Sequence, residues 1–142
     1  MDPSRSAEMI CAPEAAADIT KVVGLEPIRP LAPTWVDHVY ACDYSYAVDE
    51  TMGLSVKELS SAAETKVYFD SQAQVLGRTK TLVNVGEDAY ATSTGSAVVR
   101  KDYKVLIVDV SRLPERFGKP VGSRASIATA VAMTVLRCWT GD

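Results

Sequence analysis

The sequence predicts an α+β domain in which one antiparallel sheet of about five to six strands packs against three helices. Apolar residues recur at helical spacing in three segments, near the start, the middle and the end of the chain. Between these segments lie short stretches rich in β-branched and aromatic residues, separated by turns of hairpin length. The 142 residues, 47% hydrophobic and 23% charged, suit one globular domain. We expect this domain at residues 11–142 and a disordered N-terminal tail at residues 1–10.

The first helix is expected at residues 13–23. Pro13 suits the first helical position, where its missing N–H costs nothing. Gly24 supplies the left-handed conformation that ends many helices. Three prolines then predict an irregular connector, since each fixes φ and removes a donor: Pro27, Pro30 and Pro33.

A first strand is expected at residues 35–48, because apolar and aromatic residues alternate there. Residues 49–53 predict a turn, and residues 54–59 a second strand pairing back as a hairpin. A middle helix follows at residues 60–76, with Ser61 and Glu64 in the spacing of a capping box. Gly77 is expected to end it.

Four more strands are predicted at residues 79–85, 89–93, 96–100 and 103–110, and their short spacing favours an antiparallel meander. Residues 111–122 predict a loop, and Ser123 is expected to cap a last helix that runs to about residue 138. The abundance of alanine in this helix suits close packing on a sheet.

The composition argues against several classes of function. A net charge of −3 offers no general attraction for nucleic acid or anionic membranes. The first residues lack the apolar run of a signal peptide, and no stretch approaches the roughly 18 apolar residues of a membrane span. Taken literally, these features indicate a cytosolic chain. We expect no cofactor and no metal, because the single histidine and three cysteines form no zinc motif.

The three cysteines, Cys11, Cys42 and Cys138, allow three alternative single disulfides or three buried thiols. A bridge between Cys11 and Cys42 would close a loop of about 30 residues and contribute roughly 3–4 kcal/mol in the chain-entropy model. The cysteines alone leave these alternatives open.

Short motifs resemble a family of actinobacterial envelope lipoproteins classified only as a domain of unknown function. Cys11 precedes a short helix, Cys42-Asp43-Tyr44 matches a Cys-x-aromatic strand, and residues 85–90 match a Val-Gly-acid-acid-Ala-Tyr element. The resemblance implies an exported protein, attached to the extracellular face of the membrane or cell wall through a lipidated cysteine that this sequence lacks. It further implies a Cys11–Cys42 disulfide. It assigns no activity, and Cys138 has no counterpart in it.

An aromatic groove between sheet and helix is one candidate site, and core packing is the alternative role of the same side chains. Its expected members are Trp35, Tyr40, Tyr44, Tyr46 and Tyr68.

The acids Glu87 and Asp88 could perform acid–base chemistry, but no further oxygen ligands surround them, and a role in the turn is the favoured interpretation. His38, the lone histidine, has Asp37 on the opposite face of its strand and therefore lacks an orienting partner. Basic residues of the last loop, Arg112, Arg116, Lys119 and Arg124, could hold an anion or simply be solvated.

The predicted function is a non-enzymatic domain of the cell envelope that binds a protein partner or a small ligand. One alternative is a carrier that holds a lipid or other apolar ligand in a cavity between sheet and helices. Another is a small enzyme that uses Glu87 and Asp88.

Overall fold

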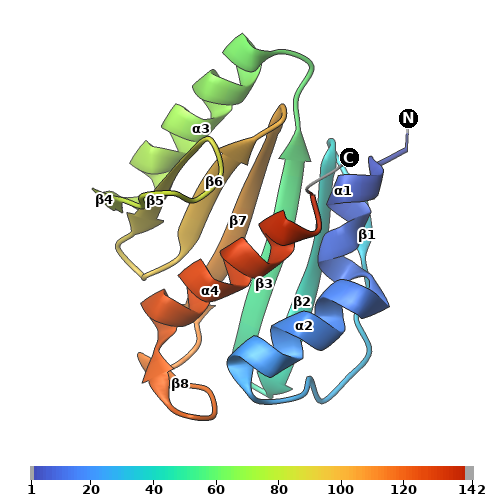
Figure 1. The fold of residues 1–142 in the computed structure, drawn as a ribbon, viewed down its shortest axis with the longest axis vertical. Coiled ribbons are helices and arrows are strands. Elements are labelled where there is room, and N and C mark those ends of the chain that lie inside the picture. The colour runs from blue at the N-terminus through green and yellow to red at the C-terminus, as the bar shows by residue number, and fades with distance from the viewer. Residues whose placement is uncertain (1, 140–142) are drawn as a thin grey trace.

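A computed structural model describes residues 2–139 and has one seven-stranded antiparallel sheet in the order β1-β2-β3-β7-β6-β5-β4 (Figure 1). Its strands are β1 Thr34–Val36, β2 Val39–Ala47, β3 Glu50–Glu58, β4 Arg78–Thr81, β5 Asp88–Thr92, β6 Ala97–Lys101 and β7 Lys104–Arg112. The helices are α1 Arg5–Glu8, the 3₁₀ turn η1 Met9–Cys11, α2 Pro13–Val23, α3 Ala62–Leu76 and α4 Arg124–Arg137. The predicted α+β class, with N-terminal, middle and C-terminal helices on one sheet, is confirmed.

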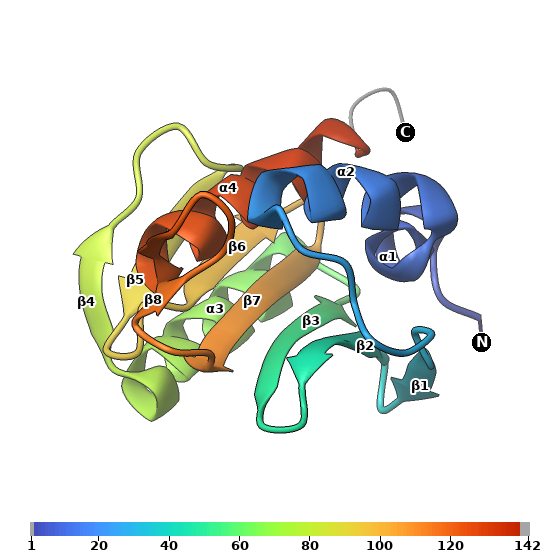
Figure 2. The same cartoon turned by 90° about the horizontal axis from the view of Figure 1, so that it is seen from below.

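The sheet lies between two helical layers (Figure 2). On one face, α1, α2 and α4 enclose the main core, which includes Met52, Leu54 and Leu106 from the sheet. On the other face, α3 closes a smaller core around Phe69 and Tyr90. Alternation along each strand therefore sends one parity of residues into each core.

The helix ends lie at the capping residues that the sequence predicts. The N–H groups of Glu64 and Ser126 donate to the hydroxyls of the N-cap residues Ser61 and Ser123. Gly24 ends α2 with φ +81°, and a Cβ at Gly24 would lie 1.7 Å from the Lys119 carbonyl oxygen. Only glycine suits this position, since both the left-handed backbone and the close approach of the 119 loop exclude a side chain.

The prediction of one strand at residues 35–48 was wrong. Asp37 and His38 adopt positive φ of 53° and 60° and form a tight turn between β1 and β2. The two pieces then pair with each other as an antiparallel hairpin. This turn creates an additional edge strand and helps to bring the sheet to seven strands rather than five or six.

The expected disordered tail at residues 1–10 also differs from the structure. Residues 5–11 are helical, and Ala7 and Ile10 are completely buried. The indole Nε1–H of Trp139 donates to the Ser6 carbonyl over 2.8 Å, and the Tyr44 hydroxyl donates to the Ile10 carbonyl over 2.7 Å. These tertiary hydrogen bonds order a segment whose own sequence carries little helical signal.

Two further elements depart from their predicted bounds. The strand expected at residues 79–85 is the short, fully exposed β4, because only Arg78–Thr81 pairs with β5. The loop at 111–122 contains a small second hairpin, formed by β8 Arg116–Phe117 and β9 Gly122–Ser123.

Tyr90 makes the fold sensitive to alkali. Burial raises the pKa of the Tyr90 hydroxyl from 10.0 to about 12. Because the folded state keeps this proton more tightly than the unfolded chain, its contribution to stability is constant below pH 10 and falls as the pH rises toward 12. Urea unfolding measured across this range should show the decline. Tyr90→Phe should reduce its slope, and an unchanged slope would contradict the assignment.

Candidate functional site

Helix α3 covers only part of its face of the sheet, and beyond it lies a hollow of about 490 Å³ that we call the sheet groove. Strands β2, β3 and β7 form its floor, and the last turns of α3 and the β5–β6 turn form its rim. Its polar lining residues are Asp43, Ser55, Gln72, Ser93, Thr94, Ser96, Asp109, Ser111 and Arg112. Val75, Leu76 and Ile107 add apolar surface.

Strand register places two carboxylates on either side of a glycine in this floor. Asp43 of β2 pairs with Gly53 of β3, and Gly53 pairs with Asp109 of β7. A Cβ on Gly53 would lie 3.3 Å from Asp43 Oδ1, 3.6 Å from an Arg112 guanidinium nitrogen and 3.7 Å from Asp109 Cβ. The missing side chain therefore leaves a gap on which three charged residues converge.

The charges in the groove are unevenly paired. Arg112 donates to Asp43 Oδ1 over 3.3 Å, and both side chains are more than half exposed. Asp109 Oδ1 accepts the Ser111 backbone N–H at 2.8 Å and faces the Ser96 hydroxyl at 3.4 Å. Within residues 2–139, no hydrogen bond joins Asp109 Oδ2 to another protein group. One carboxylate oxygen of the groove thus remains available to a ligand.

A chain of hydroxyls supports Asp109 from β5 and β6. Ser96 Oγ accepts the Val110 N–H at 2.9 Å and lies 3.1 Å from Thr94 Oγ1, which in turn lies 3.1 Å from Thr92 Oγ1. Ser96 is almost entirely buried, so its hydroxyl orientation is restricted by these neighbours. The network holds the Asp109 side chain in place at the groove floor.

Comparisons with family models, curated proteins and solved structures gave no match to this chain. The interpretation of the site therefore rests on its own geometry.

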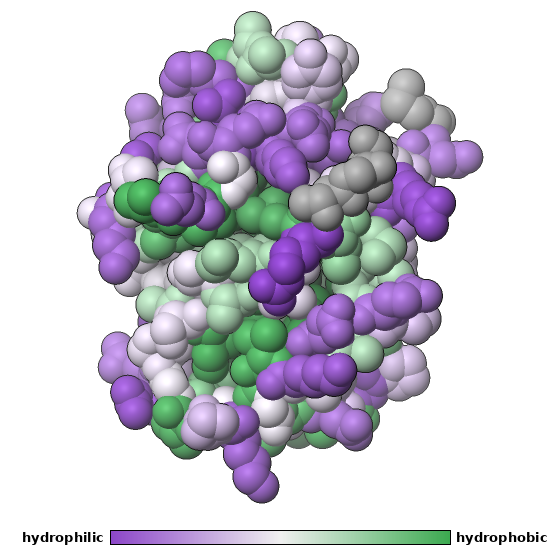
Figure 3. Space-filling model, in the orientation of Figure 1, coloured by the Kyte–Doolittle hydropathy of each residue, from purple (hydrophilic) through white to green (hydrophobic). Residues whose placement is uncertain are grey.

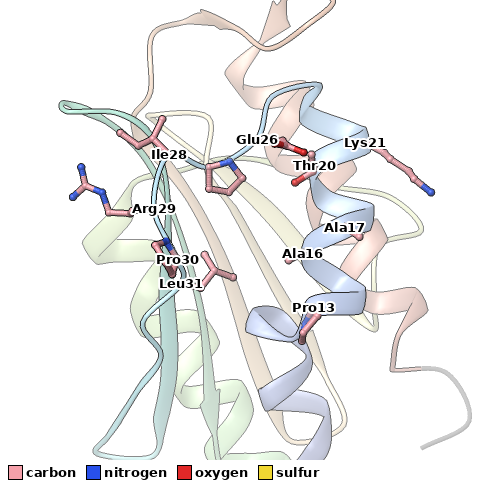
Figure 4. A pocket seen from close by; sticks show the side chains of 11 residues that line it. Pro13, Ala16, Ala17, Thr20, Lys21, Glu26, Ile28, Arg29, Pro30 and Leu31 are labelled. Carbon is pink, nitrogen blue, oxygen red and sulfur yellow. The ribbon is translucent and has the colours of Figure 1, made fainter.

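A second hollow, of about 750 Å³, lies between α2 and the proline connector and is called here the helix groove (Figure 4). Small side chains of α2, among them Ala16 and Ala17, form one wall, and the proline connector with Ile28 and Leu31 forms the other. Figure 3 shows that apolar residues reach the surface of the α2/α4 side in separate patches bordered by hydrophilic residues.

The aromatic residues predicted to line one groove are divided between the two faces of the sheet. Tyr44 is completely buried in the main core, where Tyr40 and Tyr46 also pack. Tyr68 belongs to the core under α3, and Lys57 Nζ lies 5.6 Å from its ring centroid. Trp35 stands at the edge of the sheet with its ring 5.7 Å from that of His38. The five side chains do not form a common groove, and three of them pack in the main core.

The carrier alternative requires a ligand cavity between the sheet and the helices, but core side chains fill that space. On the α2/α4 side, the interface is occupied by fully buried side chains such as Tyr44, Met52 and Ile19. The helix groove lies beside that layer, between α2 and the proline connector.

The acids Glu87 and Asp88 lie at an exposed turn leading into β5. A Glu87 oxygen accepts the Asp102 N–H at 3.3 Å, and Asp88 accepts the Ala89 N–H at 3.0 Å. Asp88 also lies 3.9 Å from Arg100. Both carboxylates therefore accept hydrogen bonds from nearby backbone N–H groups.

Two of the four basic residues of the last loop bind separate partners. Arg112 reaches Asp43 in the sheet groove, whereas Arg124 donates to the Leu113 carbonyl over 2.8 Å. Within residues 2–139, no three His, Cys, Asp or Glu side chains are grouped closely enough to hold a metal. In the same range, no helix has the length and apolarity of a membrane span.

The disulfide implied by the family resemblance is present. Cys11 at the end of η1 is bonded to Cys42 in β2. Cys138 stands apart from this bridge, and its thiol donates to the Thr134 carbonyl over 3.7 Å.

Sequence reasoning missed the sheet groove because it placed Gly53 in a turn. In the structure Gly53 lies within β3, between two paired strands. One signal was available: Asp109 is the charged residue on the parity of Val105 and Ile107, in the most apolar strand. A carboxylate at such a position indicates an open or functional patch of the sheet.

Proposed function

We propose that this chain is a non-enzymatic, extracytoplasmic binding domain and that the sheet groove is its site for a small polar ligand. The observation that carries the proposal is Gly53, a glycine inside a central strand with a carboxylate opposite it on each side. A glycine weakens a strand interior, and one common reason for its presence is the close approach of another molecule.

The chemistry of the groove supports binding rather than turnover. Asp43 is paired with Arg112, and Asp109 accepts hydrogen bonds from Ser111 and Ser96. Acceptors fixed in this way suit the recognition of donor groups on a ligand. Apolar rim residues such as Val75, whose side chain is 74% exposed, would exclude water from one side of a bound molecule.

The disulfide supports the proposed compartment. Bridges such as Cys11–Cys42 persist in oxidising surroundings and are rare where thiols are kept reduced. Together with the resemblance to envelope lipoproteins, this bridge favours a location outside the cytoplasm. A lipid anchor in the full protein would then hold the domain at the outer face of the membrane.

Gly53→Val tests the site, because the added side chain fills the gap between the carboxylates and suits a β-strand. We would titrate labelled protein with a set of small polar compounds and follow backbone amide signals by NMR. Binding compounds should shift the signals of Asp43, Gly53 and Asp109, and Gly53→Val should abolish these shifts.

Thr34→Val is the matched control. Thr34 is an exposed residue of β1, and its partner Ala41 lines the same face of the sheet. This change replaces a hydroxyl with a methyl group, keeps the β-branched shape, lies outside the residues that line the sheet groove, and should leave the titrations unchanged. Equal loss in both variants, or shifts clustered around the helix groove instead, would contradict the proposed site.

A further inference from the structure

From the charges of the sheet groove we infer that its ligand carries a protonated amine, with Asp109 as the counter-ion. This inference rests on the proposed function of the groove and specifies the chemical class that it recognises. The lining contains two carboxylates and one guanidinium, so its net charge is negative.

The pairing inside the groove leaves that negative charge at Asp109. Arg112 lies 3.3 Å from Asp43, and the two groups largely neutralise each other. Asp109 has no cationic partner within 4.0 Å in the described chain, and its hydrogen bonds come from the neutral groups of Ser96 and Ser111. A carboxylate held by neutral donors keeps its full charge, and an ammonium group would compensate it.

The end of α3 adds to the negative potential at the rim. The helix ends at Leu76, whose side chain lines the groove together with those of Gln72 and Val75. Its last turn contains no basic side chain. Because the C-terminal end of a helix carries a partial negative charge of about −0.5, this rim also favours a cation.

The absence of a side chain at Gly53 keeps the groove floor open beside Asp109, because a Cβ there would lie 3.7 Å from Asp109 Cβ. The Asp109 carboxylate is the group that would pair with an ammonium in this space. An ammonium nitrogen has three donors, and the groove offers Asp109 together with the hydroxyls of Ser55, Ser93, Thr94 and Ser111 as acceptors. Hydroxyl groups on the ligand would form hydrogen bonds with the same side chains.

Calorimetric titration with ethanolamine, glycerol and acetate separates the contributions of amine, hydroxyl and carboxylate. At low ionic strength we expect ethanolamine to bind at least tenfold more tightly than glycerol, and acetate not to bind. Raising the salt concentration should weaken ethanolamine binding, since the attraction is electrostatic.

Asp109→Asn keeps the shape of the side chain and removes its charge, and it should reduce ethanolamine affinity at least tenfold. Asp49→Asn, in the exposed turn between β2 and β3, is the matched control and should leave the ethanolamine affinity unchanged. Thermal unfolding would show that both variants are folded.

The outcomes separate this inference from the proposed function. If glycerol binds as tightly as ethanolamine, and Gly53→Val abolishes both, the groove remains a ligand site but the assignment to amines is overturned. Unchanged ethanolamine affinity in Asp109→Asn overturns it as well. If none of the probes, and none of the wider set of polar compounds, binds the protein, the proposed function fails together with the inference.

Discussion

Replacing both Cys11 and Cys42 with alanine should lower the free energy of unfolding by about 3–4 kcal/mol. The bridge closes a loop with a sequence separation of 31, which contains α2, the proline connector and β1. Without it, the unfolded chain regains the conformational entropy of that loop. Urea unfolding followed by circular dichroism measures the loss, and a reductant should reproduce it in the wild-type protein.

Cys138→Ala is the control for this prediction. Cys138 is only partly buried, and its thiol donates to the Thr134 carbonyl over 3.7 Å. Its replacement should cost less than about 1 kcal/mol. Thiol quantification of the unfolded, unreduced protein isolated from its own cells should find one thiol per chain. Three thiols would contradict both the bridge and the proposed compartment.

Phe69→Ala should destabilise the domain by about 3–5 kcal/mol. Phe69 is the large apolar side chain that α3 buries fully, and its ring lies 4.8 Å from that of Tyr90. The Tyr90 hydroxyl also donates to the Phe69 carbonyl over 2.8 Å. Hydrogen exchange should show lost protection along α3 before the rest of the sheet, because this helix packs through the smaller of the two cores.

Val67→Ala is the matched control on the same helix. Val67 is 70% exposed, so its truncation should change stability by less than about 0.5 kcal/mol. A similar loss in both variants would show that Phe69 does not anchor α3. Because α3 forms part of the rim of the sheet groove, Phe69→Ala should also lower the affinity of the groove for its ligand.

Elements with local signals were predictable from the sequence. Ser61 and Glu64 mark the start of α3, and Gly24 marks the end of α2, because capping chemistry involves neighbouring residues. The short turn-bounded stretch at 96–100 and the apolar run at 103–110 predicted β6 and β7 to within a few residues.

Elements that depend on distant partners were not predictable. The turn at Asp37 and His38 lacks the glycine that is common in such hairpin turns, so one strand was predicted where two exist. Residues 5–11 are ordered by contacts with Tyr44 and Trp139, which lie far along the chain. The sheet groove needs the register of three strands, which no single segment encodes.

The two outermost strands of the sheet affect how copies of the domain behave at high concentration. β1 has three residues, and β4 has four, all exposed, including Arg78 and Lys80. Short edges with charged side chains offer little backbone for another sheet to extend. We therefore expect the domain to resist edge-to-edge aggregation at high concentration, so that the groove of each copy stays accessible.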